Sequence, residues 1–170
     1  MAGLQVAFRI FSKNDPDPAT LVTQLNVALK ENLPQSKFVT LFLGRLDTRT
    51  GIVEYVNAGH TPPLWLRGRE VNELQESDLL LGVITRAEFV NRKVQLEPGD
   101  SLILFTDGVT EARNEAGIDL GSNIIAEAVK GLHGRDANAI ATAVGDTVLA
   151  YVGDAENLDD DVTLVVVSRA

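Results

Sequence analysis

From residue 38 onward the apolar residues recur with a period of two, and this pattern constrains the fold more than any other feature of the chain. Residues 38–46 (FVTLFLGRL) and 51–57 (GIVEYVN) are typical of β-strands, and residues 47–50 form a connection typical of a hairpin. Strands joined by a hairpin pair in antiparallel fashion. The sequence therefore predicts an antiparallel sheet in this part of the chain.

The order of the remaining segments indicates the fold class. Further strands are expected at residues 64–67, 69–74, 88–96, 101–106 and 162–168. Helices are expected at residues 1–11, 18–32, 123–131 and 137–152. Because these segments lack the regular alternation of a doubly wound protein, the chain is predicted to be α+β with antiparallel sheet. We expect residues 1–170 to form a single domain.

Two polar turns separate predicted elements. Residues 12–18 (SKNDPDP) include two prolines that disfavour a continued helix, and Asp17 can cap the helix that follows. Residues 98–100 (PGD) predict a turn directly before the strand at 101–106.

The composition excludes several classes of function. The chain has no cysteine, which excludes disulfides, thiolate zinc sites and cysteine nucleophiles. Its net charge of −9 disfavours binding to nucleic acid or to an anionic membrane surface. Apolar runs such as residues 79–81 and 164–167 are far too short to cross a bilayer.

Much of the negative charge is concentrated just before the last predicted strand. The acidic residues between positions 154 and 161 are Asp154, Glu156, Asp159, Asp160 and Asp161, and no basic residue lies among them. Consecutive carboxylates repel one another unless a cation compensates them. Mg²⁺ and Mn²⁺ prefer such hard oxygen ligands, so this segment is a candidate for one side of a metal site.

A second candidate carboxylate is Asp107, which follows the buried strand expected at residues 101–106. A side chain at the end of a strand has a rigid backbone, and the neighbouring Gly108 lets another group approach closely. If the two strands are neighbours, Asp107 and one aspartate of residues 159–161 could share a metal ion. Each segment read singly is also compatible with an ordinary turn or a solvated loop.

Other catalytic arrangements find little support. Phosphatases of the haloacid dehalogenase type need a nucleophilic aspartate where this chain has Phe105. His60 lies in a turn-rich segment without a serine and acid partner pattern, which favours a structural role. His133 lies at the end of a predicted helix, where a cation is favourable in any case.

Four stretches in linear order point to a known family. They are FVTLFLGRLD with GIVEYVNAGHTPPLWLR, then LLLGV, then LEPGDSLILFTDGVTEARN, and finally DDDVTLVVV. Together they resemble the PPM-type (PP2C-like) serine/threonine phosphatases of the SpoIIE/RsbU class. The resemblance implies an antiparallel β-sandwich flanked by helices, with a metal-binding cleft at its edge. It also implies hydrolysis of phosphoserine or phosphothreonine by a water that bridges two Mn²⁺ or Mg²⁺ ions.

The resemblance assigns roles residue by residue. Asp107 matches the metal-ligating aspartate of the family's Thr-Asp-Gly motif, and Asp160 matches the ligand in Asp-[Asp/Asn]-x-Thr. Asp159 is expected to be outer-shell or solvated. The positions expected to support the site are Gly108, Asp161, Asn57, Gly59 and His60.

Two acidic motifs of the family, Gly-Asp-x-x-Asp and Gly-Asp-Val-x-Gly-x-Gly, do not occur in this sequence. Residues 1–11 resemble the helix that follows the second of them. The resemblance therefore predicts an N-terminally truncated chain, the C-terminal portion of a phosphatase domain that lacks its first strands. We expect a partial metal site and impaired turnover.

The resemblance also implies a biological setting. The expected substrate is a phosphoserine protein, an anti-sigma-factor antagonist, within cytoplasmic signalling that controls a sigma factor, with no nucleic acid and no membrane insertion. One alternative is a non-catalytic module, a pseudophosphatase that only binds a partner. Another is a homodimer in which a second chain pairs with an open strand edge.

Overall fold

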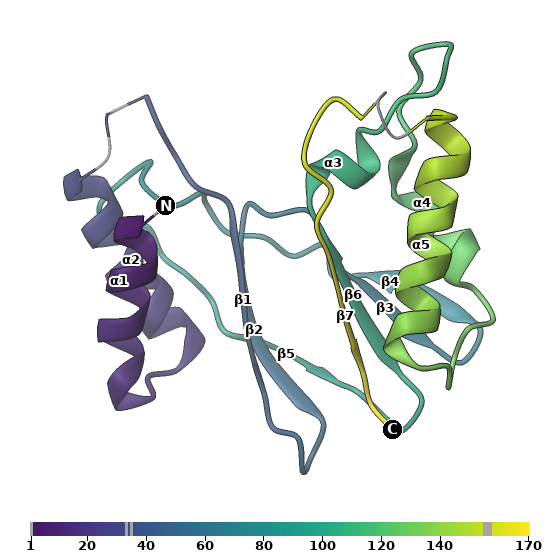
Figure 1. The fold of residues 1–170 in the computed structure, drawn as a ribbon. Coiled ribbons are helices and arrows are strands. Elements are labelled where there is room, and N and C mark those ends of the chain that lie inside the picture. Colours follow the sequence, from purple (N-terminus) through teal and green to yellow (C-terminus); the bar gives the residue numbers. More distant parts are fainter. Residues whose placement is uncertain (1, 33, 35, 155–157) are drawn as a thin grey trace. The chain divides into compact units, whose positions relative to one another are not determined.

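A computed structural model describes residues 2–32, 34, 36–154 and 158–170 (Figure 1). The chain divides into two compact units, each made of two segments. The first unit consists of Met1–His60 with Glu76–Gln95, and the second consists of Thr61–Gln75 with Leu96–Ala170. We describe each unit by itself.

Within its described part, the first unit contains two helices, a 3₁₀ turn and one antiparallel sheet. Its elements are α1 (Ala2–Phe11), the turn Ser12–Asn14, α2 (Pro18–Asn32), β1 (Leu41–Leu46), β2 (Ile52–Ala58) and β5 (Arg92–Gln95). The strand order is β1-β2-β5. Helix α2 packs its apolar face against the sheet, where Val22 and Leu29 join Val56 in one buried cluster.

The start of α2 shows the predicted cap. The Asp17 carboxylate accepts hydrogen bonds from the Thr20 amide at 3.1 Å and from the Thr20 hydroxyl at 2.7 Å. Hydrogen bonds from Thr20 and Asn91 lower the pKa of Asp17 from 3.8 to about 2. The helix therefore begins at Pro18, as the sequence predicts.

In the described residues, the second unit combines a four-stranded antiparallel sheet with three helices. Its elements are β3 (Leu64–Arg67), β4 (Glu70–Glu73), β6 (Ser101–Phe105), α3 (Asp107–Thr110), α4 (Gly121–Val129), α5 (Ala137–Val152) and β7 (Leu164–Ser168). The strand order is β4-β3-β6-β7. Two antiparallel sheets accompanied by helices confirm the predicted α+β class.

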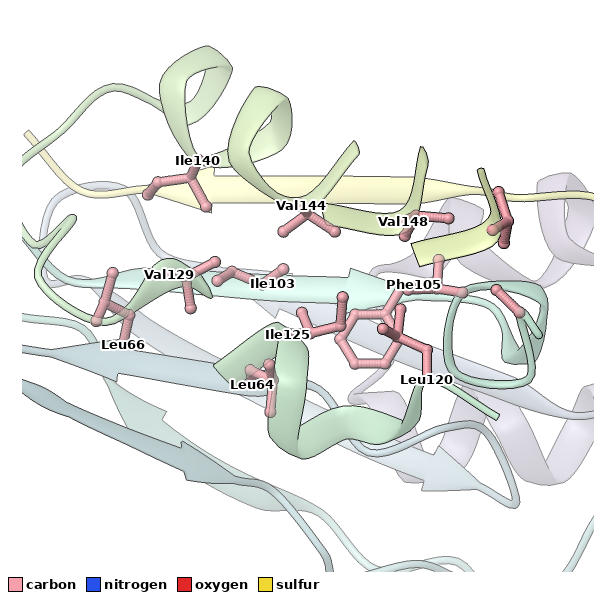
Figure 2. Close-up of a cluster of buried hydrophobic side chains, with 13 residues drawn as sticks. Leu64, Leu66, Ile103, Phe105, Leu120, Ile125, Val129, Ile140, Val144 and Val148 are labelled. Atoms are coloured by element: carbon pink, nitrogen blue, oxygen red, sulfur yellow. The ribbon is translucent and has the colours of Figure 1, made fainter. Parts of the chain in front are cut away.

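Aliphatic side chains build the core of the second unit (Figure 2). Helix α5 contributes Ile140, Val144 and Val148, which recur at helical spacing and are all buried. They pack with Ile103 and Phe105 of β6, and Phe105 is the only aromatic residue among the buried members of this cluster in the described chain. The sequence predicts such a core, because only 5% of its residues are aromatic.

A buried carboxylate holds the turn before β6 together. Asp100 is 1% exposed and accepts hydrogen bonds from the Glu97 amide at 2.9 Å and from Arg67 Nε at 2.8 Å. Trp65 Nε1 lies 3.4 Å from its Oδ2, and His133 Nε2 lies 3.3 Å from its Oδ1. Burial would raise the pKa of Asp100, but the bonds from Glu97 and Arg67 outweigh it and lower the pKa below 3.8. Asp100 therefore links β3, the turn and the loop after α4.

Several boundaries differ from the sequence prediction, and a side-chain contact explains one of them. Strand β5 begins at Arg92 and not at residue 88, because the amide of Val90 donates to the Asp78 carboxylate. Strand β1 begins at Leu41, while Val39 forms only an isolated bridge. Helix α4 begins at Gly121, two residues earlier than predicted.

The segment after β6 is not the ordinary turn with which the sequence of Asp107 and Gly108 is also compatible. They form the start of the short helix α3. Among the described residues, no helix has both the length and the apolar character needed to span a bilayer.

Replacing Ile140 by alanine tests the core of the second unit. Because Ile140 is 0% exposed, the I140A variant should lose about 2–5 kcal/mol of unfolding free energy. Leu149 lies on the same helix and is 47% exposed, so L149A should cost about 0.5 kcal/mol or less. Urea denaturation followed by circular dichroism measures both values, and equal losses would contradict the assigned core.

The Asp100→Asn variant tests the buried carboxylate. At pH 7 it should lose about 2 kcal/mol, because Arg67 and the Glu97 amide lose a charged acceptor. The folded pKa lies below 3.8, so this stabilisation is present above that pH and is lost as the pH falls through the folded pKa. Urea titrations at pH 7 and pH 3 should show the gap to wild type narrowing at pH 3, and Asp146→Asn, on the exposed side of α5, serves as control.

Candidate metal centre

The two acidic segments predicted from the sequence meet at one end of the second unit's sheet. Strands β6 and β7 pair in antiparallel fashion, and Phe105 lies opposite Leu164. The end of β6 and the approach to β7 therefore lie side by side, as the shared-ion hypothesis requires. Asp107 follows β6 directly, and Asp160 lies on the approach to β7.

Gly108 lies directly against the acidic segment. A methyl group in place of its hydrogen would lie 2.5 Å from the carbonyl oxygen of Asp161 and 3.1 Å from its carbonyl carbon. No side chain fits there without displacing backbone, so the close approach predicted for Gly108 has a direct steric basis. Its part in a metal site stays a prediction.

Each candidate ligand is partly fixed by its own neighbour in the chain. Asp107 Oδ1 accepts a hydrogen bond from the Gly108 amide at 3.0 Å, and Asp160 Oδ1 accepts one from the Asp161 amide at 2.7 Å. Within the described residues, the second oxygen of either carboxylate makes no hydrogen bond or ion pair. Both side chains belong to exposed residues. Two anionic oxygens are thus available at neighbouring positions.

The donor set fits part of a site for a hard divalent cation. Carboxylate oxygens are the ligands that Mg²⁺ and Mn²⁺ prefer, and Mg²⁺ usually keeps several waters. No cluster of three or more histidine, cysteine, aspartate or glutamate residues suited to a metal is found in the described part of the chain. Asp107 and Asp160 would therefore provide part of a coordination shell.

Other acids of the segment are placed differently. The Asp159 carboxylate lies 3.7 Å from Arg113 Nη1 and is 71% exposed, while Arg113 Nε also pairs with Asp119 at 2.9 Å. This surface ion pair agrees with an outer position for Asp159. Glu156 lies outside the described residues.

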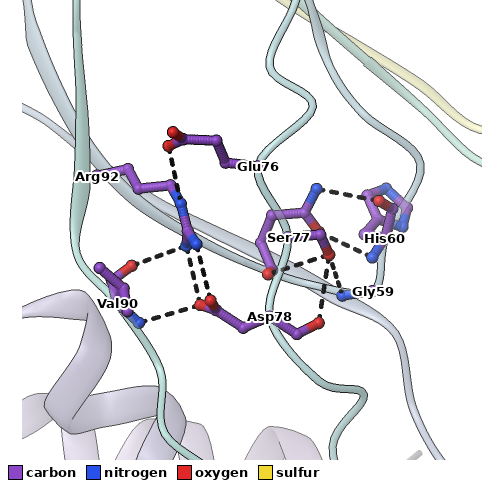
Figure 3. Close-up of polar contacts among 8 residues, drawn as sticks. Gly59, His60, Glu76, Ser77, Asp78, Val90 and Arg92 are labelled. Atoms are coloured by element: carbon purple, nitrogen blue, oxygen red, sulfur yellow. Dashed lines mark hydrogen bonds and ion pairs between the residues drawn. The ribbon is translucent and has the colours of Figure 1, made fainter.

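The turn at residues 57–60 belongs to the first unit, and Figure 3 labels two of its residues, Gly59 and His60. The side chain of Asn57 holds this turn. Asn57 Nδ2 donates to the His60 carbonyl at 3.0 Å, and the His60 amide donates to Asn57 Oδ1 at 2.8 Å. Gly59 has φ of +72°, and a methyl group there would overlap the Leu80 side chain. These contacts agree with a structural role for Asn57, Gly59 and His60, while their support of a metal site stays a prediction.

A half-buried ion pair beside this turn is absent from the sequence-based hypotheses. The Arg92 guanidinium makes two hydrogen bonds to Asp78, at 2.8 and 2.9 Å, and its Nε donates to Glu76 at 3.0 Å. Burial would raise the pKa of Asp78, but the bonds from Arg92 and the Val90 amide lower it. Ser77 lies between Glu76 and Asp78 in the sequence, and its hydroxyl accepts a hydrogen bond from the Gly59 amide at 3.0 Å. The residues in these contacts are 14 to 20 positions apart in the chain, so the helical or strand periodicity of the sequence does not predict them.

Comparison with known proteins gives consistent relatives. All of residues 1–170 match the family model described as Stage II sporulation protein E (SpoIIE). Phosphoserine phosphatase RsbU of Bacillus subtilis (strain 168) is 30% identical over 102 residues, which cover 59% of this chain and 30% of that protein. Stage II sporulation protein E of the same strain is 28% identical over 151 residues, covering 89% of this chain and 18% of that protein. The chain thus matches less than a third of the length of either relative.

Solved structures share the fold. The SiaA-PP2C domain of Pseudomonas aeruginosa superposes with a TM-score of 0.81 at 24% identity, over 98% of this chain and 66% of that one. The PP2C phosphatase domain of SpoIIE from Bacillus subtilis, with a fragment of its regulatory domain, gives a TM-score of 0.80 at 24% identity, over 96% of this chain and 47% of that one. These likenesses confirm the PP2C-like fold.

The Gly108→Ala variant tests the contact between α3 and the acidic segment. The added methyl group should push the Asp161 carbonyl away and cost about 1–3 kcal/mol of stability. Gly145 in α5 is the matched control, because a methyl group there meets nothing within 4 Å and alanine favours a helix by about 1 kcal/mol. Thermal unfolding and the amide chemical shifts of residues 160–163 measure the effect. A G108A protein with wild-type stability and unshifted amides would contradict the contact.

Proposed function

The chain belongs to the SpoIIE family of PPM-type serine/threonine phosphatases, and from this premise we propose that it forms part of a metal-dependent enzyme that hydrolyses phosphoserine on a regulatory protein. The observation that supports the proposal is the meeting of Asp107 and Asp160 at the paired ends of β6 and β7. These two aspartates occupy the positions at which the family motifs place metal ligands.

Asp107 and Asp160 would hold Mn²⁺ or Mg²⁺ through their carboxylate oxygens. A bound ion of this kind supplies an activated water and offsets charge on the phosphoryl oxygens. The protein's own contribution is to hold two negative charges at fixed backbone positions, on the sheet end for Asp107 and on the adjoining segment for Asp160. The contact at Gly108 keeps the two segments together without a side chain between them.

The 170-residue chain is proposed to bind metal weakly and to turn over slowly by itself. Two further acidic motifs of the family do not occur in its sequence. A binuclear site needs more carboxylates than Asp107 and Asp160 supply, and loss of ligands lowers both metal affinity and water activation.

The proposed substrate is phosphoserine on an anti-sigma-factor antagonist in the cytoplasm. One relative is a protein named phosphoserine phosphatase RsbU. Another, at 25% identity and a TM-score of 0.77, contains the RsbU and RsbW domains of one Mycobacterium tuberculosis protein. The substrate of this chain is inferred from that class.

A non-catalytic module that binds a partner is the second candidate function. The observation that favours it is the lack, within the described residues, of a third metal-ligating side chain beside Asp107 and Asp160. Calorimetry with Mn²⁺ separates the two functions, because a module of this kind should bind no ion even at millimolar concentration.

The Asp107→Asn variant tests the proposed site. Hydrolysis of a phosphoserine peptide by the wild-type chain should be slow, should depend on Mn²⁺, and should fall about tenfold or more in D107N and in D160N. Asp146→Asn, at an exposed position of α5, should leave the rate unchanged. Mn²⁺-dependent turnover that survives the substitution of Asp107 would refute the site.

A further inference from the structure

Thr106 stands between the last residue of β6 and Asp107, and its hydroxyl makes two bonds to the acidic segment. Thr106 Oγ1 donates to the Asp161 carbonyl at 3.1 Å and accepts a hydrogen bond from the Thr163 amide at 3.0 Å. The Thr106 amide in turn donates to the Thr163 carbonyl at 3.1 Å. One hydroxyl thus serves both as donor and as acceptor, as threonine allows.

These bonds explain why β7 begins at Leu164 and does not include Thr163. In an antiparallel ladder a hydrogen-bonded pair of residues exchanges two main-chain bonds. Thr106 and Thr163 make only one of them, because the Thr163 amide donates to the hydroxyl and not to a main-chain carbonyl. The hydroxyl therefore ends the ladder at this point and diverts the preceding residues out of the sheet.

The diverted segment passes directly against α3. The Asp161 carbonyl that Thr106 holds is the same oxygen that would lie 2.5 Å from a methyl group on Gly108. The Asp161 carbonyl is thus held by the Thr106 hydroxyl on one side and lies against the backbone of Gly108 on the other. Asp160 precedes this fixed carbonyl, and Asp107 precedes Gly108, so the same contact sets both carboxylates.

We propose that Thr106 is a positioning residue for the metal centre, whose hydroxyl holds the segment of Asp160 against the segment of Asp107. The proposal rests on the proposed function, because it assumes that these two aspartates bind the ion. Thr106 does not itself contact the ion or the substrate. Groups that orient metal ligands in this way commonly change metal affinity by about tenfold or more when they are removed.

The test compares Thr106→Val, which keeps the shape and removes the hydroxyl, with Thr106→Ser, which keeps the hydroxyl. Thr147→Val is the matched control, because the Thr147 hydroxyl is also half-buried and bonds a carbonyl, that of Ala143 within α5, at 2.7 Å. Two quantities are measured on the full chain by NMR. They are amide hydrogen exchange at Thr163 without metal and the Mn²⁺ concentration that broadens the amide signals of residues 106–109 and 160–163.

T106V should speed exchange at Thr163 by about fivefold, because its amide loses its acceptor. It should also raise the Mn²⁺ concentration needed for half-maximal broadening by about tenfold. T106S should restore both values towards wild type, and T147V should change neither.

Two results would overturn the positioning role. In one, T106V exchanges faster at Thr163 but binds Mn²⁺ as wild type does, which makes the hydroxyl purely structural. In the other, exchange at Thr163 is unchanged, which means that the bond does not order the segment. A parallel Mn²⁺ titration of D107N separates a failure of the positioning role from a failure of the metal centre. If D107N loses Mn²⁺ binding and T106V does not, only the role of Thr106 fails, whereas unchanged binding in D107N refutes the metal centre itself.

Discussion

The candidate centre depends on the antiparallel pairing of β6 with β7, in which Phe105 lies opposite Leu164. This register brings together residues more than fifty positions apart, since Thr106 and Thr163 are separated by 57. Buried apolar residues of β6, together with α5, fix the sheet from one side. A carboxylate placed just beyond such a sheet inherits its rigidity, which a flexible loop could not provide. The placement of the candidate carboxylates is therefore a consequence of one strand pair.

The same register also brings the negative charges of residues 159–161 close to Asp107. Of the three consecutive aspartates 159–161, Asp160 and Asp161 pass with their backbone against Gly108, the residue after Asp107. Like charges held this close raise the free energy of the folded chain. Arg113 compensates one of them by pairing with Asp159, on the outer side of the segment. Asp107 and Asp160 have only main-chain amides as partners within the described residues. A divalent cation would compensate such a pair, which is the basis on which Asp107 and Asp160 are proposed as metal ligands.

Local signals in the sequence predict much of the fold. The cap at Asp17 and the helical spacing of Ile140, Val144 and Val148 give α2 and α5 with their observed bounds, and the alternating pattern gives the hairpin of β1 and β2. Two of the failures, at β5 and β7, share one cause, which is a side chain that bonds distant backbone. The Asp78 carboxylate accepts a hydrogen bond from the Val90 amide, which shortens β5. The Thr106 hydroxyl accepts one from the Thr163 amide, which shortens β7. Such bonds join residues 12 and 57 positions apart and leave no periodic trace. The motif positions of Asp107 and Asp160 were predictable, but the hydroxyl that holds them together was not.

Both units contain the same local arrangement, in which a polar side chain bonds the backbone next to a glycine that allows close approach. In the first unit the Asn57 side chain holds a turn whose Gly59 leaves room for Leu80. In the second unit the Thr106 hydroxyl holds a segment for which Gly108 leaves room. In each case a polar side chain replaces a main-chain partner, and a glycine admits the neighbouring chain. A non-catalytic relative would need both arrangements to fold in the same way. The glycines and their polar neighbours therefore account for the backbone path in each unit, whereas the proposed phosphatase activity depends on the carboxylates at the paired strand ends.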